Sequence, residues 1–89
     1  MPLQPVFTSR FHKDVELAKQ RGKDTNKLRA LILLLLDQQS LAARYHDHWL
    51  SGNYSNRREC HIEPDWLLIY KPGETLIIFE RTGTHSDLY

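Results

Sequence analysis

The sequence predicts an α+β domain in which two N-terminal helices pack on one small antiparallel sheet. The first observation is that two stretches of the N-terminal half, separated by Gly22, place apolar residues at helical spacing. The second is that the C-terminal half contains apolar and β-branched runs, separated by turn residues at Pro64 and at Pro72-Gly73. A chain that places its helices first and its strands afterwards is typical of the α+β class.

The first helix is expected to start at Thr8 or Ser9, because a hydroxyl side chain accepts a hydrogen bond from a free amide of the first turn. Its apolar stripe repeats at i, i+4 and i+7 and consists of Phe11, Val15 and Ala18. Gly22 is expected to end it, because glycine readily adopts the left-handed conformation that follows many helices. Residues 4–7 could form a short edge strand, where a proline is tolerated.

The second helix is expected to be capped by Asp24 and to be buried on more than one side. Its main stripe follows i, i+3, i+4, i+7 and i+8 and consists of Leu28, Leu31, Ile32, Leu35 and Leu36. Leu33 and Leu34 widen this stripe. The apolar run at residues 31–36 is too short to span a bilayer.

Residues 57–62 and 66–70 are expected to form a hairpin around Glu63-Pro64-Asp65, because proline fixes φ and has no N–H to donate. On the first strand, side chains alternate, so that Glu59 and His61 share one face with Arg57, opposite Arg58, Cys60 and Ile62. Residues 66–70 are almost unbroken apolar sequence, which indicates a central strand buried on both faces. Residues 75–80 are expected to form a third strand. Residues 38–56, which precede the hairpin, show no clear period, and such long connections are often functional.

Length and composition predict a single domain, residues 1–89, with no disulfide. One cysteine suits a reducing compartment, and no basic segment followed by an apolar core marks a signal peptide, so a cytoplasmic protein without a membrane partner is expected. The net charge of +1 argues against nucleic-acid binding through bulk charge. Any RNA contact must then come from the basic residues of the second half, which are Arg44, Arg57, Arg58, Lys71 and Arg81.

Five histidines in 89 residues are the unusual feature of the sequence. His48, His61 and His85 lie in polar settings, and imidazole exchanges protons near neutral pH, as general acid–base catalysis requires. Glu59 and Asp65 could hold such rings in orientation. RNA cleavage by the neighbouring 2′-hydroxyl fits these needs, since it uses one base, one acid and a cation that stabilises the phosphorane.

Substrate binding would need a phosphate-binding cation and flat surfaces for unpaired bases, but no metal or cofactor. Arg81 could bind phosphate, because guanidinium matches its geometry with two hydrogen bonds. Stacking on a base could come from Tyr89, Trp49 or Trp66.

Ordinary structural roles remain open beside these functional ones. A hydrogen-bonded histidine without catalytic function is the commoner state for His48 and His61, and Trp66 is more often a core residue than a platform for a base. His12 and His46 read as surface residues, and Cys60 as a buried thiol. A zinc site built on His46, Asp47, His48, Cys60 and His61 lacks the paired close spacing of structural zinc sites.

Three segments resemble the YafQ toxins, a family within the RelE/ParE superfamily. They are residues 47–52 (DHWLSG), 58–66 (RECHIEPDW) and 79–89 (FERTGTHSDLY), and the similarity extends over residues 11–89. The resemblance implies a compact fold like that of the microbial ribonucleases. It also implies a bacterial type II toxin that acts as a ribosome-dependent mRNA endonuclease and cuts codons in the ribosomal A site.

The resemblance implies that the catalytic positions are His48, His61, Asp65 and His85. His85 would be the general acid and His61 or His48 the base, with Asp65 orienting the base or sharing its role. The substrate-binding positions would be Arg81, Tyr89, Trp66 and Arg58. The chain departs from the family at Tyr89, where phenylalanine is frequent, and at Glu59, where relatives can carry aspartate.

The resemblance further implies a DinJ- or RelB-like antitoxin with a DNA-binding dimer domain, the 70S ribosome and mRNA as partners. Operator DNA would be bound only through the antitoxin complex. Two alternatives stay open. A ParE-like toxin would bind and inhibit gyrase without cutting nucleic acid and would not need His48, His61 and His85. An interaction module would carry these histidines incidentally.

Overall fold

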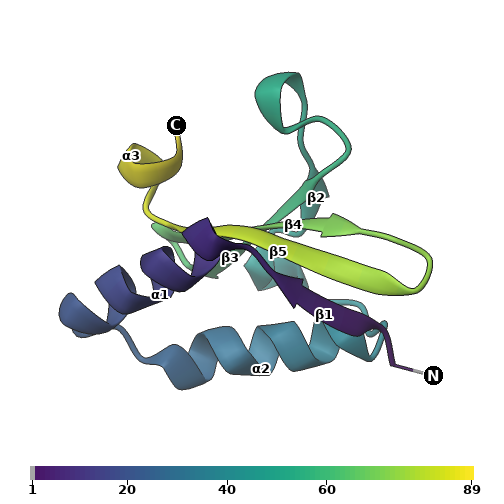
Figure 1. Ribbon diagram of the computed structural model, residues 1–89, viewed down its shortest axis with the longest axis horizontal. Coiled ribbons are helices and arrows are strands. Elements are labelled where there is room, and N and C mark those ends of the chain that lie inside the picture. Colours follow the sequence, from purple (N-terminus) through teal and green to yellow (C-terminus); the bar gives the residue numbers. More distant parts are fainter. Residues whose placement is uncertain (1) are drawn as a thin grey trace.

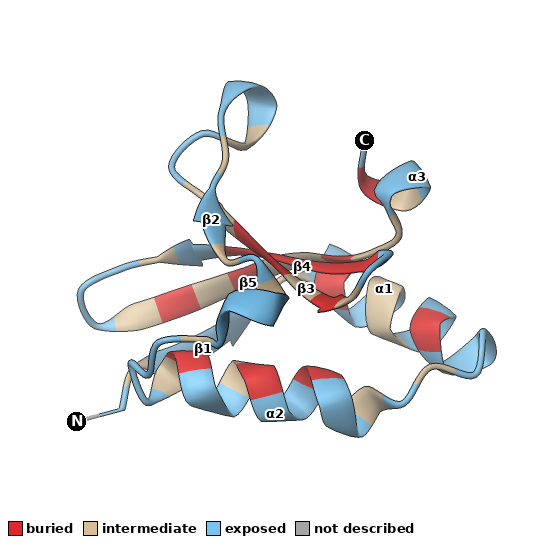
Figure 2. Cartoon of the chain, turned by 180° about the vertical axis from the view of Figure 1, so that it is seen from behind, coloured by how far each residue is buried: buried red, intermediate tan, exposed pale blue. Residues whose placement is uncertain are grey.

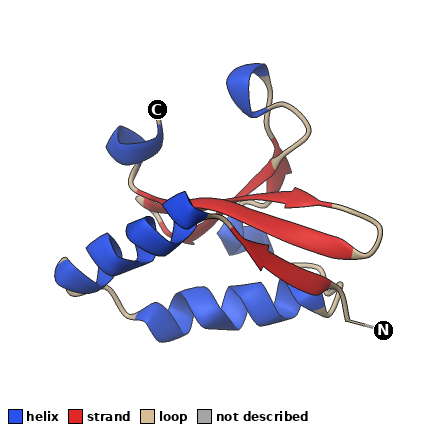
Figure 3. Cartoon of the chain, in the orientation of Figure 1, coloured by secondary structure: helices blue, strands red, loops and turns tan. Residues whose placement is uncertain are grey.

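The computed structural model describes residues 2–89, and Figure 1 shows a sheet with two long helices on one of its faces. The helices are α1 (Ser9–Gln20), α2 (Thr25–Leu36) and the short α3 (His85–Leu88). The strands are β1 (Gln4–Phe7), β2 (His48–Trp49), β3 (Arg58–Glu63), β4 (Trp66–Pro72) and β5 (Leu76–Gly83). Figure 3 distinguishes helices from strands and confirms the predicted α+β class.

The sheet has the strand order β1-β5-β4-β3-β2 and is mixed. Strands β3, β4 and β5 form the predicted antiparallel meander, but β1 pairs parallel with β5, with Gln4 opposite Leu76 and Phe7 opposite Phe79. This corrects the expectation of a purely antiparallel sheet. Pro5 indicated an edge strand, but a local pattern does not encode the direction of a partner strand at the other end of the chain.

The predicted irregular connector contains a fifth strand. Two short 3₁₀ turns, η1 (Ala43–Tyr45) and η2 (Gly52–Tyr54), flank β2, in which His48 lies opposite Glu59 and Trp49 opposite Arg58. A strand of two residues is too short to show an alternation of period two in the sequence. Its pairing with β3 places His48 on the sheet.

The caps of the two long helices agree with the sequence. Thr8 Oγ1 accepts a hydrogen bond from the Phe11 amide at 3.0 Å, and the Asp24 carboxylate accepts one from the Asn26 amide at 3.0 Å. Gly22 has a φ of +79° after the end of α1, as expected of a residue that terminates a helix. No helix within residues 2–89 combines the length and the apolarity needed to cross a membrane.

Two apolar clusters lie on the two faces of the sheet. The larger cluster packs α1 and α2 against one face, and Figure 2 shows buried segments where these helices meet the sheet. Its strand residues include Cys60, Trp66 and Phe79. The smaller cluster, on the other face, joins Leu67 and Ile69 of β4 to Leu88 of α3. Burial of β4 on both faces confirms its prediction as a central strand.

Helix α3 is held in place by its N-terminal cap and by a side-chain contact with α1. Thr84 Oγ1 accepts from the Asp87 amide and the Asp87 carboxylate accepts from the Thr84 amide, which is a capping box. Arg21 of the α1 C-cap donates to Asp87 at 2.6 Å. A Cβ on Gly83 would lie 2.9 Å from an Asp87 carboxylate oxygen, so glycine permits this close approach. These contacts fix the position of His85 at the start of α3.

Candidate active site

Glu59 and His61 of β3 lie on the sheet face opposite α1 and α2, because they alternate with the core residues Cys60 and Ile62. Figure 1 shows β2 and α3 rising above this same face. The ring centroid of His61 lies 6.3 Å from that of His48 in β2 and 5.7 Å from that of His85 in α3. The fold therefore brings together the three histidines that the sequence singled out.

Glu59 lies at the centre of this histidine cluster and is buried. One carboxylate oxygen lies 3.4 Å from Nε2 of His61. The other accepts a hydrogen bond from the Tyr89 hydroxyl at 2.7 Å and lies 3.9 Å from Nε2 of His48. Glu59 therefore fixes the ring of His61 and links it to the C-terminal residue.

Asp65, in the turn between β3 and β4, holds His85. One of its carboxylate oxygens accepts from the His85 backbone amide at 2.8 Å and lies 2.6 Å from the ring Nδ1. These hydrogen bonds hold the pKa of Asp65 below its usual range, so the carboxylate is ionised at neutral pH. Because the carboxylate accepts from Nδ1–H, Nε2 is the nitrogen of His85 left for a ligand.

The environment of His61 favours its neutral form. Burial lowers the pKa of His61 from its usual range, Glu59 acts in the opposite direction, and the positive charges of the neighbouring histidines lower it further. A neutral imidazole at pH 7 can accept a proton. For His48, Nδ1 lies 2.5 Å from the carbonyl oxygen of His46, so Nδ1–H donates and Nε2 is the acceptor of the neutral ring.

His46 belongs to the same cluster and is exposed, so the prediction of a surface residue is confirmed. Its ring centroid lies 5.3 Å from that of His61. The backbone of His46 has a φ of +48°, which turns the chain between η1 and β2. The spacing of His46 and His48 was visible in the sequence, but nothing local indicated that this turn would face β3.

The family profile described as "Bacterial toxin of type II toxin-antitoxin system, YafQ" matches residues 3–89. The chain is also 48% identical over 84 residues to "mRNA interferase toxin YafQ" of Escherichia coli strain K12, which covers 93% of this chain and 91% of that protein.

The chain belongs to the YafQ family of toxins.

Two solved structures of relatives have nearly the same fold. The E. coli DinJ-YafQ toxin-antitoxin complex contains a chain with a TM-score of 0.92 and 44% identity, covering 100% of this chain and 99% of that one. A metal-bound toxin from Helicobacter pylori has a TM-score of 0.91 and 35% identity, covering 98% and 99%. The fold predicted from the resemblance to the YafQ family is therefore confirmed.

Two of the substrate-binding residues expected from the YafQ family lie away from the histidine cluster. Trp66 is 1% exposed and packs in the larger core, with the Lys23 ammonium 5.8 Å from its ring centroid, so it is not available to stack on a base. Arg58 lies on the opposite face of β3 from His61 and is bound to Asp47 at 3.1 Å. The alternation along the strand already placed Arg58 on the opposite face from His61. For Trp66, the sequence left a core role open beside the stacking role.

Arg81, the expected phosphate ligand of the YafQ family, is held by an acidic partner. Its Nε donates to an Asp14 carboxylate oxygen at 2.8 Å and its Nη2 to the other oxygen at 3.3 Å. The same carboxylate accepts from the Thr82 amide at 3.1 Å. These hydrogen bonds raise the pKa of Arg81, and they occupy Nε and Nη2 of the guanidinium, whereas Nη1 lies outside this ion pair. The sequence did not indicate this contact between α1 and β5.

Glu59, His61 and His85 could also hold a metal ion in this member of the YafQ family. Each offers one ligand atom, and these atoms lie within 4.8 Å of one another. Two imidazoles and a carboxylate are a ligand set that suits zinc or copper. Cys60 lies on the other face of β3, where burial raises the pKa of its thiol to about 12, so it cannot complete such a set.

Proposed function

We propose that this toxin is an endoribonuclease that cuts mRNA in the ribosomal A site by metal-independent acid–base catalysis. The observation that supports this most is the distance of 5.7 Å between the rings of His61 and His85, with Glu59 beside one and Asp65 bound to the other. Two imidazoles with separate carboxylate partners can exchange two protons in one reaction. The E. coli relative is named an mRNA interferase.

In the proposed reaction, neutral His61 takes the proton of the 2′-hydroxyl. The 2′-oxygen then bonds to phosphorus, and the bond from phosphorus to the 5′-oxygen breaks. Protonated His85 donates its Nε2 proton to that leaving oxygen, while Asp65 holds Nδ1–H. The products are a 2′,3′-cyclic phosphate and a 5′-hydroxyl. His48 is the alternative base, and its ring centroid lies 6.3 Å from that of His61.

This assignment changes the proposed role of Asp65. The family resemblance implied that Asp65 orients the base, but its contacts in this chain are with His85, the proposed acid. Glu59 takes the orienting role for His61 instead. Tyr89 remains the proposed aromatic for a base of the substrate, since it is 62% exposed.

We further propose a DinJ-like antitoxin as the partner that restrains the toxin, because the solved E. coli relative is in a complex with DinJ. Operator DNA would be bound by the antitoxin of that complex. The ribosome would supply the mRNA in an extended form. A domain with a net charge of only +1 has little general attraction for free RNA, which agrees with a requirement for the ribosome.

Primer extension on a reporter mRNA in a purified translation system tests the proposal. We expect cuts in phase with codons when ribosomes are present, no cuts on free mRNA, and a loss of cutting in H61A and H85A. Growth arrest without any cut, retained in the triple variant of His48, His61 and His85, would instead favour a gyrase-binding toxin.

The metal requirement has its own test. Cutting should survive treatment with EDTA once Mg²⁺ has been added back to keep the ribosomes intact. Added Cu²⁺ should inhibit cutting, because an ion bound to His61 and His85 would block both proton transfers. Cutting that EDTA abolishes and only Zn²⁺ restores would contradict the metal-independent mechanism.

A further inference from the structure

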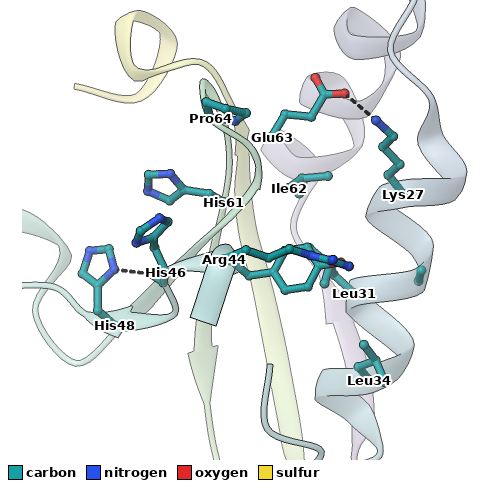
Figure 4. A pocket seen from close by; sticks show the side chains of 12 residues that line it. Lys27, Leu31, Leu34, Arg44, His46, His48, His61, Ile62, Glu63 and Pro64 are labelled. Atoms are coloured by element: carbon teal, nitrogen blue, oxygen red, sulfur yellow. Dashed lines mark hydrogen bonds and ion pairs between the residues drawn. The ribbon is translucent and has the colours of Figure 1, made fainter. Parts of the chain in front are cut away.

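A cavity of about 860 Å³ lies beside the histidine cluster, between α2 and the turn η1. Figure 4 shows His46, His48 and His61 on one side of this cavity and Leu31 and Leu34 of α2 on the other. Its volume lies in the usual range of sites for small molecules. Because His61 lines the cavity, a ligand bound there would lie next to the proposed catalytic base.

Arg44 is the cation of this cavity that no carboxylate neutralises. Arg58 and Arg81 are each bound to an aspartate, whereas Arg44 takes part in no ion pair among residues 2–89. Its Nη2 donates to the Tyr45 hydroxyl at 2.8 Å, and its guanidinium carbon lies 4.8 Å from the centroid of the Tyr45 ring. The guanidinium is therefore held beside Tyr45, and because the Arg44 side chain is exposed, a flat ligand can reach it.

On the opposite rim of the cavity, Lys27 and Glu63 are lining residues of opposite charge, and Lys23 lies outside the lining. Lys23 and Lys27 share the single carboxylate of Glu63, at 2.9 Å and 3.0 Å. The Asp24 carboxylate also acts on Lys27, so the two ammonium groups face two carboxylates, and the charge of Arg44 is the one left without a carboxylate partner among the described residues that line the cavity. The whole chain has a net charge of only +1, so it is the unpaired guanidinium of Arg44 that favours an anionic ligand here.

The floor of the cavity is apolar, with Leu31, Leu34 and Ile62 among its lining residues. An apolar floor and an unpaired guanidinium held beside an aromatic ring together match an unpaired nucleotide. The base would stack on the guanidinium, and the phosphate would lie toward the histidines or the lysines.

We propose that this cavity is the subsite for one unpaired nucleotide adjacent to the phosphate that is cut, with Arg44 as the stacking residue. This inference rests on the proposed nuclease function and adds a substrate-binding position to it. Its position matters because Arg58 and Trp66 are unavailable and Arg81 is bound to Asp14.

The test compares R44A with R29A in the purified translation system. Arg29 is the matched control, because it is an exposed arginine of α2 outside this cavity. R44A should raise the toxin concentration needed for half-maximal cutting by roughly tenfold, with the rate at saturating toxin unchanged within about twofold. R29A should match the wild type in both. R44K should recover only part of the affinity, since an ammonium keeps the charge but lacks the plane.

Wild-type cutting in the same experiment separates this inference from the proposed function. No cutting by the wild type would overturn the nuclease function and the subsite with it. Wild-type cutting matched by R44A, or fully restored by R44K, would overturn the subsite alone. R44A with wild-type cutting but weakened binding to the antitoxin would show that the cavity receives a protein, which also overturns it.

Discussion

At the residue scale, the charge of Glu59 and the charge of His46 act on His61 in opposite directions. Glu59 raises the pKa of His61, whereas the positive charge of His46 lowers it. E59Q removes the side chain that raises the pKa of His61, and H46Q removes one that lowers it. The pKa of His61 should therefore fall in E59Q and rise in H46Q, as measured by NMR titration of its ring protons.

The same two variants should move the pH dependence of cutting. A protonated His61 cannot accept the 2′ proton, so cutting should decline as pH falls through the pKa of His61. We expect this decline to move to lower pH in E59Q and to higher pH in H46Q. Shifts of the same sign in both variants would contradict the assignment of His61 as the base.

Arg81 and Asp14 give a second prediction at this scale. D14N removes the charge that holds the guanidinium, so Arg81 becomes free to bind phosphate. We expect D14N to cut at least as fast as the wild type at low substrate, while R81A loses roughly a hundredfold in rate. If both variants lose stability in urea denaturation but neither changes cutting, the pair has only a structural role.

At the element scale, α3 is the segment that holds the proposed acid in place. The Thr84 cap fixes the start of α3, where His85 meets Asp65. T84A should lower the free energy of unfolding by about 1 kcal/mol and should also slow cutting, because His85 is displaced. T8A is the matched control, since Thr8 caps α1 away from His85 and also binds the Glu80 carbonyl.

Urea denaturation and the cutting rate should be measured together for these two variants. T8A should lose at least as much stability as T84A without a comparable loss of rate at a temperature where both are folded. Equal losses of rate at equal losses of stability would mean that α3 contributes no special positioning of the acid.

Local sequence patterns predicted the parts of the site that depend on one element. Alternation along β3 placed Glu59 and His61 together, and turn chemistry placed Asp65 at the end of that strand. The contact of Asp65 with His85 depends instead on how α3 folds back over β4. The family resemblance identified these residues, but the pairing of each carboxylate with its histidine came from the tertiary structure.

At the scale of the whole molecule, the sequence predicted the helices, the meander and the central strand, because each has a clear period or turn signal. It did not predict the parallel direction of β1, the strand β2 or the packing of His46 against His61. These features depend on contacts between distant segments. Contacts between distant segments also bind Asp14 to Arg81. They likewise place η1 and α2 so that both line the cavity.

In the proposed mechanism, His61 and His85 transfer the two protons of RNA cleavage. The most direct measurement uses a reporter mRNA in which sulfur replaces the 5′-bridging oxygen at one mapped cleavage site. Sulfur leaves without a proton from the general acid. We expect H85A to cut this mRNA at nearly the wild-type rate and H61A to stay inactive. Inactivity of H85A on this mRNA, or recovery of H61A as well, would contradict the mechanism.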